Sequence, residues 1–269
     1  MAESFYLPAG EDTWLATQHT IGPWDARAQH AGPPSALLGR SIQRCAPRDD
    51  MMVTRFTCEI LGAVPVGEIQ VRARLARPGR SVELLEAVAS AGGREVARAT
   101  AWRVKRAAAP GVAPRGEPPP PLPGQPPAGA DWPATSRGWE DGYLSAIDWR
   151  PVRGHFTEPG PATVWARLRY PLVPDEEPGP LERVLAIADS GNGVSSELDL
   201  RQWLFINPEL TVHLHREAAG EWICLDAQAV ISPGGAGLAT SVLSDTSGQI
   251  GVGAQALLVV RRSPPAAGD

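Results

Sequence analysis

Hydrophobic and polar positions alternate along four successive segments in the first half of the chain. In the second of these segments Ile69 and Val71 share one face, and Arg72 lies on the other. A period of two residues predicts strands that bury one face. The expected strands are Met51–Leu61, Gly67–Pro78, Arg80–Ala91 and Arg94–Lys105. Two glycines between the last two strands predict a tight hairpin.

Two shorter strands and one helix are expected ahead of this group. The strands fall at Phe5–Leu7 and Thr13–Ile21. The helix is expected over Pro33–Cys45, because prolines in a first turn lose no hydrogen bond. Its apolar run, Ala36–Leu38, predicts that the helix is largely buried.

The second half of the chain repeats this order of elements. A strand is expected at Thr163–Tyr170, and a helix over Pro180–Asp189. Apolar residues of this helix follow the i, i+3, i+4, i+7 spacing of an amphipathic helix, namely Leu181, Val184, Leu185 and Ala188. Four further strands are expected at Gln202–Arg216, Glu221–Ile231, Gly237–Asp245 and Gln249–Arg262.

Residues 107–131, between the two halves, contain nine prolines and no hydrophobic periodicity. Proline fixes φ and lacks an N–H group, so this segment is predicted to be an extended, semi-rigid spacer. A ligand for SH3-like domains is the alternative use of such a segment.

Long antiparallel strands that curl around one buried helix form a hotdog, and the element order predicts this arrangement twice. We expect an α+β double hotdog with an N-terminal hotdog at 1–106, a linker at 107–131 and a C-terminal hotdog at 132–263. Pairing of two edge strands would complete one continuous sheet, which removes exposed edges. Two unrelated α+β domains are the alternative, which the repeated order disfavours.

The composition, 43% hydrophobic and 20% charged, is that of a globular protein. The formal charge of −5 gives no electrostatic reason to expect a nucleic acid or an anionic membrane as partner. No signal-like segment or membrane-length apolar run stands out, and the three cysteines lack metal-like spacing. We therefore expect a reduced, cytoplasmic protein with no membrane insertion, no metal and no cofactor. The arginine bias, with Lys105 as the only lysine, is typical of a GC-rich bacterial genome.

The end of the second predicted helix holds a carboxylate in an unfavourable place. Asp189 follows an apolar run, so burial is expected, and it lies at the negative end of the helix dipole. Costs of this type gather at functional sites. The structural alternative is that Asp189 caps the turn that follows it.

Two amide side chains on later strands are suitable partners for Asp189. Asn207 lies near the start of an apolar strand, where asparagine is disfavoured. Gln255 stands among small and aliphatic residues, so it needs hydrogen-bond partners in the protein if it is buried. The alternative is that Gln255 lies on the exposed face of its strand. A carboxylate can remove a proton from a water molecule that amides orient. No serine–histidine–acid or cysteine–histidine set presents itself, which disfavours a covalent acyl-enzyme.

Other candidate residues lie at the start of the first helix and on one late strand. We assign His30, Ala31 and Gly32 to substrate binding, because N–H groups at a helix N-terminus can hold a developing oxyanion. His30 either assists there or only packs. His213 and His215 alternate on their strand, but no third metal ligand stands out, and solvent-facing histidines are the simpler interpretation.

Residues 29–38, QHAGPPSALL, resemble the first-helix entry of thioesterase-like proteins related to bacterial acyl-CoA thioesterase II. Residues 188–193, 205–216 and 253–255 resemble the matching segments of the second half. The resemblance covers nearly the whole chain except the linker. It implies a double-hotdog fold and hydrolysis of acyl-CoA to free acid and CoA, by a water molecule that an aspartate, a threonine and a glutamine activate.

In that pattern Asp189 takes the place of the aspartate and Gln255 that of the glutamine. Matching on the His215-Arg216 pair sets Asn207 at the threonine position, whereas Thr211 lies four residues on. The expected catalytic set is therefore Asp189, Asn207 and Gln255, with Thr211 as the alternative third member. The first half shows no acid after its helix, which suggests one active site per chain.

Two other functions remain open. A non-catalytic acyl-CoA-binding double hotdog would explain the asparagine at the threonine position. A hotdog enoyl-CoA hydratase would carry an Asp-x-Asn-x-x-x-His motif, and no histidine follows Asn192 at that distance. The expected partner is acyl-CoA or another acyl thioester, and a homodimer or higher homo-oligomer is compatible with the sequence. Neither the acyl chain length nor the choice between CoA and carrier-protein thioesters can be read from it.

Overall fold

The computed structural model describes residues 4–109, 111–112, 118–125, 141–154, 158–199 and 202–262. The strands of the first half are β1 (Tyr6–Pro8), β2 (Thr13–Ala16), β3 (Met51–Ile60), β4 (Glu68–Arg77), β5 (Val82–Ala91) and β6 (Arg94–Lys105). Those of the second half are β7 (Ile147–Arg153), β8 (Ala162–Leu168), β9 (Trp203–Ile206), β10 (Glu209–Leu214), β11 (Ile223–Ile231), β12 (Ala236–Asp245) and β13 (Gly248–Arg261). The α-helices are α1 (Gly32–Arg44), α2 (Pro180–Ala188) and α3 (Gly191–Val194).

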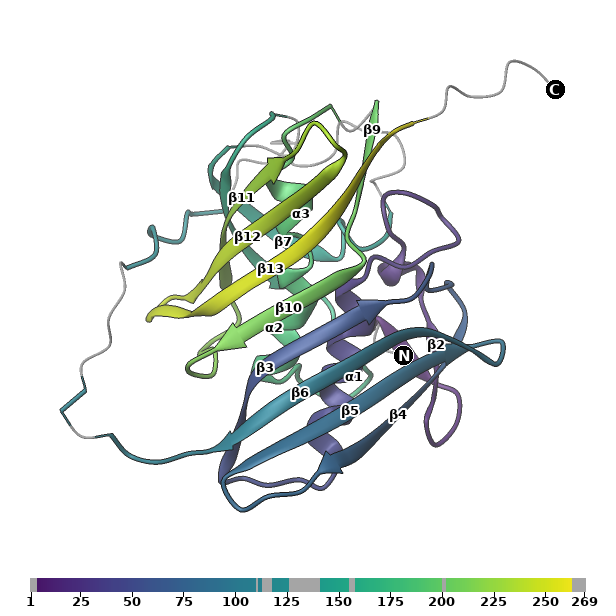
Figure 1. Ribbon diagram of the computed structural model, residues 1–269, viewed down its shortest axis with the longest axis vertical. Helices are drawn as coiled ribbons and strands as arrows, with labels where there is room; N and C mark the ends of the chain where they lie inside the picture. The colour runs from purple at the N-terminus through teal and green to yellow at the C-terminus, as the bar shows by residue number, and fades with distance from the viewer. Residues whose placement is uncertain are drawn as a thin grey trace.

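All these strands belong to one sheet, whose order is β1-β2-β4-β5-β6-β3-β10-β13-β12-β11-β8-β7, with β9 also paired to β13 (Figure 1). The two halves meet where β3 pairs with β10, and Thr57 lies opposite Thr211 in this antiparallel junction. The predicted pairing of edge strands into a continuous sheet is therefore confirmed. It protects the backbone groups of β3 and β10, which would otherwise be exposed edges.

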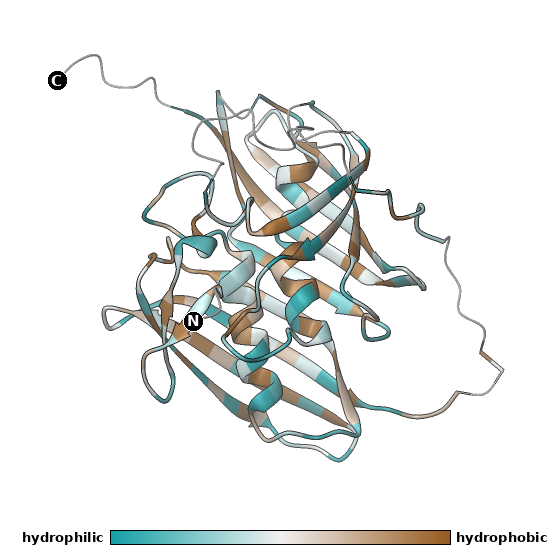
Figure 2. Cartoon of the chain, turned by 180° about the vertical axis from the view of Figure 1, so that it is seen from behind, coloured by the Kyte–Doolittle hydropathy of each residue, from teal (hydrophilic) through white to brown (hydrophobic). Residues whose placement is uncertain are grey.

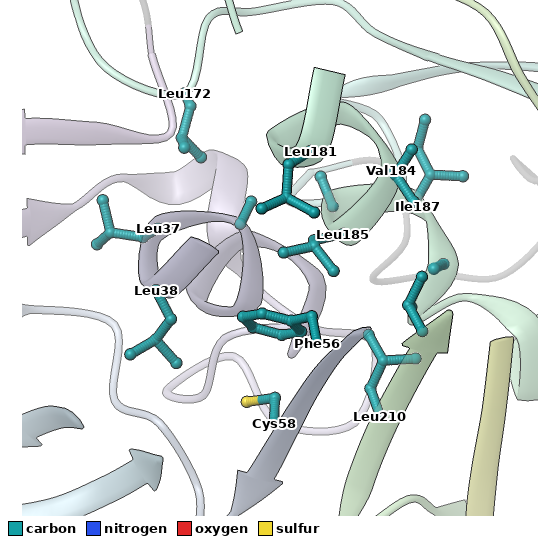
Figure 3. Packing of buried hydrophobic residues seen from close by; sticks show 14 of the residues in the cluster. Leu37, Leu38, Phe56, Cys58, Leu172, Leu181, Val184, Leu185, Ile187 and Leu210 are labelled. Carbon is teal, nitrogen blue, oxygen red and sulfur yellow. The ribbon is translucent and has the colours of Figure 1, made fainter. Parts of the chain in front are cut away.

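The helices lie together on one side of the sheet, and they are seen in front of it in the view from behind (Figure 2). α1 and α2 pack directly against each other, because Gly39 on α1 leaves room for Leu185 on α2. A Cβ atom at Gly39 would lie 2.5 Å from a Leu185 methyl carbon. Around this contact Leu37, Phe56 and Leu181 fill the space between helices and sheet (Figure 3). Burial of such side chains contributes about 1.5–3 kcal/mol each.

The expected double-hotdog fold is thus confirmed, with four main differences in its elements, one of which is the short helix α3, which was not expected. β7 was not expected, and it contains Pro151, a residue that is unusual inside a strand. Its place at the sheet edge explains why the missing N–H is tolerated. The expected strand Gln202–Arg216 is two strands, β9 and β10, which end and begin around Asn207-Pro208. The expected strand Thr13–Ile21 stops at Ala16, and the Thr17 side chain caps a 3-10 turn there.

In the described parts of the expected linker, 107–109, 111–112 and 118–125, the chain forms no helix or strand. The division at 106/107 and 131/132 stays a prediction, and residues 110, 113–117 and 126–131 lie outside the described residues. Cys58 and Cys224 are buried, whereas Cys45 is only half-buried. No helix in the described part of the chain is long and apolar enough to cross a membrane.

Candidate active site

Asp189 follows α2 directly and is 2% exposed. The helix carries it into the core because Leu181, Val184 and Leu185 anchor one face of α2 between α1 and the sheet. Burial raises the pKa of the Asp189 carboxyl from 3.8 to about 7, since a charge is costly where water is excluded. The carboxylate does not cap the following turn, because it faces side chains from three other parts of the chain.

Two amides donate hydrogen bonds to one oxygen of this carboxylate. Asn207 Nδ2 lies 2.7 Å from Asp189 Oδ1, and Gln255 Nε2 lies 3.3 Å from the same atom. Gln255 Nε2 also lies 3.0 Å from the Asp189 carbonyl oxygen. Both amides stabilise the ionised carboxylate, so they lower its pKa against the effect of burial. The structure therefore brings together the three residues predicted from the sequence.

Asn207 reaches Asp189 because the strand is interrupted at that point. Pro208 has no N–H, and the ladder between β9 and β10 is broken there. The Glu209 carboxylate fills part of the gap, where Oε1 accepts a hydrogen bond from the Ala256 N–H at 2.7 Å. Asn207 therefore does not have to follow the alternation of side chains along a regular strand, and its side chain points to the end of α2.

Gln255 lies on β13 and is 2% exposed, so the solvent-facing alternative is wrong. Its Oε1 atom accepts a hydrogen bond from the Asn192 N–H at 3.0 Å, so both ends of its amide are held. Gly191 makes this approach possible, because a Cβ atom there would lie 2.9 Å from Gln255 Oε1. The segment Ser190-Gly191-Asn192 thus leaves room for the Gln255 side chain and donates a hydrogen bond to it.

His30 contacts the other oxygen of the carboxylate, with Nδ1 3.2 Å from Asp189 Oδ2. Its ring stacks on Tyr143, with ring centroids 3.8 Å apart, and Tyr143 is fixed by hydrogen bonds to Ala186 O and Ser190 Oγ. Burial lowers the pKa of His30 to about 3, so the ring is neutral at neutral pH. His30 Nδ1 accepts a hydrogen bond from the Gly32 N–H at 3.1 Å, so the proton of the neutral ring is on Nε2. The ring therefore presents an acceptor to Asp189, which favours the protonated form of the carboxyl.

The N-terminus of α1 completes the surroundings of Asp189. The backbone N–H groups of Gly32 and Ala31 face the carboxylate and lower its pKa, and Gly32 N also lies 3.1 Å from His30 Nδ1. Pro33 and Pro34 supply no N–H. A Cβ atom at Gly32 would lie 2.2 Å from Ala186 O, so only glycine lets the two helix ends meet. The expected role of these amides in holding a substrate oxyanion stays a prediction.

Thr211, the alternative third member, points away from Asp189. Its neighbours on β10, Leu210 and Val212, are buried under the helices, whereas Thr211 bonds to Thr57 and Glu209 on the opposite side of the sheet. Asn207 is therefore the residue that the structure places against Asp189.

The two histidines of the same strand, His213 and His215, are exposed. Within the described ranges no group of three or more histidine, cysteine, aspartate or glutamate side chains could hold a metal ion.

The sequence did not single out two residues of this site. Asn192 Nδ2 lies 3.4 Å from Asn207 Oδ1 and 3.3 Å from the Phe205 carbonyl, so it orients Asn207. The sequence did contain a signal for Asn192, because an asparagine inside a run of small, buried residues needs hydrogen-bond partners. Tyr143 gives no local signal, because its contacts with His30 come from a distant part of the chain.

Comparison with known proteins identifies the family. Residues 20–104 match the model of the acyl-CoA thioesterase N-terminal domain, and residues 114–259 match that of the C-terminal domain. The chain therefore belongs to the acyl-CoA thioesterase family. None of the curated proteins matches this sequence.

Solved structures of low sequence identity share the fold. A conserved protein of unknown function with a hot dog fold from Alicyclobacillus acidocaldarius has a TM-score of 0.71 at 15% identity, covering 94% of this chain and 93% of its own. The acyl-CoA thioesterase II TesB2 of Mycobacterium marinum has a TM-score of 0.62 at 16% identity, covering 100% and 97%. The tesB protein of Mycobacterium avium subs paratuberculosis has a TM-score of 0.63 at 15% identity, covering 95% of each chain.

Proposed function

We propose that this protein hydrolyses acyl-CoA to the free acid and CoA, with Asp189 as the general base. One observation carries the proposal: a single buried carboxylate receives hydrogen bonds from Asn207 and Gln255 and faces His30. Its pKa of about 7 is suited to proton transfer near neutral pH. The family supports the substrate class, since both of its domain models are acyl-CoA thioesterase models.

In the proposed reaction Asp189 removes one proton from a water molecule, whose oxygen forms a bond to the thioester carbonyl carbon. The carbonyl oxygen becomes an oxyanion. The Ala31 and Gly32 N–H groups at the start of α1 face the ionised Asp189 in the free protein, and we propose that they stabilise this oxyanion once Asp189 is protonated. The C–S bond then breaks, and the protonated Asp189 returns its proton to the leaving thiolate. Asn207 and His30 are half-buried, whereas Asp189 and Gln255 are buried, so the proposed water molecule would approach the carboxylate beside Asn207 or His30.

The test is release of free thiol from a series of acyl-CoAs, from acetyl to palmitoyl, measured from pH 5 to pH 9. Hydrolysis should rise with pH and level off above about 7, because only the ionised carboxylate accepts a proton. The rise should be lost in Asp189→Asn together with the activity. Binding of acyl-CoA in calorimetry with no thiol release at any pH would instead establish a non-catalytic binding protein.

A further inference from the structure

Trp165 on β8 is 1% exposed although it belongs to neither hydrophobic cluster of the described residues. Its neighbours along the strand, Val164 and Ala166, point to the helices, so the indole lies on the outer face of the sheet. Elsewhere on this face large apolar side chains remain open, and Val230 on β11 is 64% exposed. Something outside the sheet must therefore cover Trp165.

The cover is the proline-rich segment 118–125. The Trp165 indole Nε1–H donates a hydrogen bond to the Pro120 carbonyl at 3.1 Å. On the neighbouring strand β7, Arg150, which lies opposite Trp165, donates one to the Pro123 carbonyl at 2.9 Å. Two adjacent strands thus hold carbonyl groups that are three residues apart in the segment.

This spacing matches one turn of a polyproline II helix, which has three residues per turn and no internal hydrogen bonds. Carbonyl groups at i and i+3 therefore point the same way and are free to accept. Residues 118–123 read PPPPLP, so the segment loses little entropy when it is held in this form. Docking of such a helix on aromatic side chains is a recurring mode of peptide recognition.

One of the two donors, Arg150, is also held by contacts outside the proline-rich segment. The Arg150 guanidinium lies over the Trp222 ring, 4.4 Å from its centre, and Arg167 lies over the same ring at 4.7 Å. Asp148 pairs with both arginines, at 3.6 and 3.0 Å. Arg150 is consequently ordered by contacts that do not involve the proline segment.

We propose that the outer face of β7 and β8, with Trp165 and Arg150 as donors, is a binding site for proline-rich segments, and that residues 118–125 occupy it as a ligand in cis. The segment 118–125, which the sequence predicted to be an extended spacer, is then bound to the sheet, and we call it the strap. The domain that binds this proline-rich segment would be the C-terminal half of the same chain and not a separate SH3-like domain. A short tether gives the segment an effective concentration on the order of millimolar. A proline-rich ligand from outside the chain would have to compete with this effective concentration, so weak ligands do not displace the strap.

The site is tested by removing the strap and offering the same segment in trans. One variant replaces residues 118–123 by Gly-Ser-Gly-Ser-Gly-Ser, which keeps the length of the linker. Calorimetry with the peptide PPPPLPGQ should show one-to-one binding to this variant, and binding at least tenfold weaker to the parent chain. Adding Trp165→Phe should weaken peptide binding about tenfold, because the Pro120 carbonyl loses its donor. The peptide AAAALAGQ is the matched control.

Equal binding of the two peptides would overturn the proposal. So would the absence of any peptide binding to a replacement variant whose circular dichroism and thermal melting show that it is folded. If the replaced chain does not fold, the milder double variant Pro119→Gly/Pro121→Gly is used instead. Among the indole N–H signals of the nine tryptophans, the signal lost in Trp165→Phe should exchange slowly with solvent in the parent chain. It should exchange faster in the double variant, and unchanged protection there would refute the assignment of the strap as cover.

Discussion

The two junctions between the ends of α1 and α2 are built very differently, although the two halves of the chain repeat the same elements. The helices are antiparallel neighbours. Gly32 at the start of α1 abuts Ala186 near the end of α2, and Gln43 near the end of α1 approaches Gly179 at the start of α2. At the first junction Asp189 is buried between His30, Asn207 and Gln255.

At the second junction the charged groups neutralise one another in ion pairs. Arg40 and Arg44 of α1 pair with Glu176, whose side chain is 39% exposed. The residue after α1 is Cys45, and the Cys45 and Ala46 carbonyls accept hydrogen bonds from Arg103. Arg103 itself is buried in an ion pair with Glu83. The same position in the fold thus holds a buried carboxylate in one half and a structural ion-pair network in the other. We infer one active site per chain.

The strongest test of this difference is to neutralise one acid at each junction. Asp189→Asn should lower kcat for acyl-CoA hydrolysis by about 10³-fold or more, since it removes the proposed base. Glu176→Gln, the matched change at the second junction, should leave kcat within twofold. Both are measured by thiol release on chains whose folding is checked by thermal melting. Equal losses from the two variants would contradict the assignment of a single site.

The pH dependence of stability should differ in sign between the two partners at the first junction. The folded pKa of Asp189 is about 7 against 3.8 ordinarily, so the folded state binds more protons and this group lowers stability as pH rises from about 4 to 7. The folded pKa of His30 is about 3 against 6.5, so its contribution rises with pH up to about 6.5. The two effects oppose each other in the parent chain.

Replacing one partner should leave only the pH dependence of stability that the other partner contributes. Relative to the parent, Asp189→Asn should gain stability as pH rises from 4 to 7, by up to about 4 kcal/mol. His30→Phe, which keeps an aromatic ring on Tyr143, should lose stability relative to the parent over pH 4 to 6.5. Urea unfolding at several pH values measures both. Parallel curves for the parent chain and both variants would show that this pair does not govern the pH response.

The contact between helix ends can be tested with one methyl group at each junction. Gly32→Ala should destabilise the fold by about 2 kcal/mol, because the added carbon would meet Ala186 O at 2.2 Å. Gly179→Ala should cost about 1 kcal/mol or less, since the nearest atom there, Glu182 Oε1, is 3.6 Å away. Urea midpoints give the comparison. A tolerated alanine at position 32 would mean that the two helix ends lie farther apart.

The last comparison concerns the third member of the site. Asn207→Ala removes a donor to Asp189 and should lower kcat about tenfold to a hundredfold. Asn207→Thr keeps a hydroxyl donor and should lose less than tenfold. Steady-state thiol release resolves the difference, and Thr211→Val serves as a control on the opposite face of the sheet. A larger loss from Thr211→Val than from Asn207→Ala would reverse the choice between these residues.

Local patterns in the sequence determined most of the fold. Alternation predicted β3 to β6, and the apolar spacing of residues 181–188 predicted α2, because these periods come from a single element. The predictions were incomplete or wrong near two prolines: β7, which contains Pro151, was not predicted, and Pro208 splits one expected strand in two. Whether a proline breaks a strand depends on its place in the sheet, and the sequence does not state that place.

The sequence by itself also determined which side chains of the second half were out of place: a carboxylate at a helix end and amides among apolar residues. Tertiary structure alone decided what they meet. His30 reaches Asp189 from the other half of the chain, and Pro120 of the segment 118–125 accepts a hydrogen bond from Trp165 on β8. Such contacts depend on how the helices and sheet pack, and packing is a property of the assembled chain rather than of any one segment.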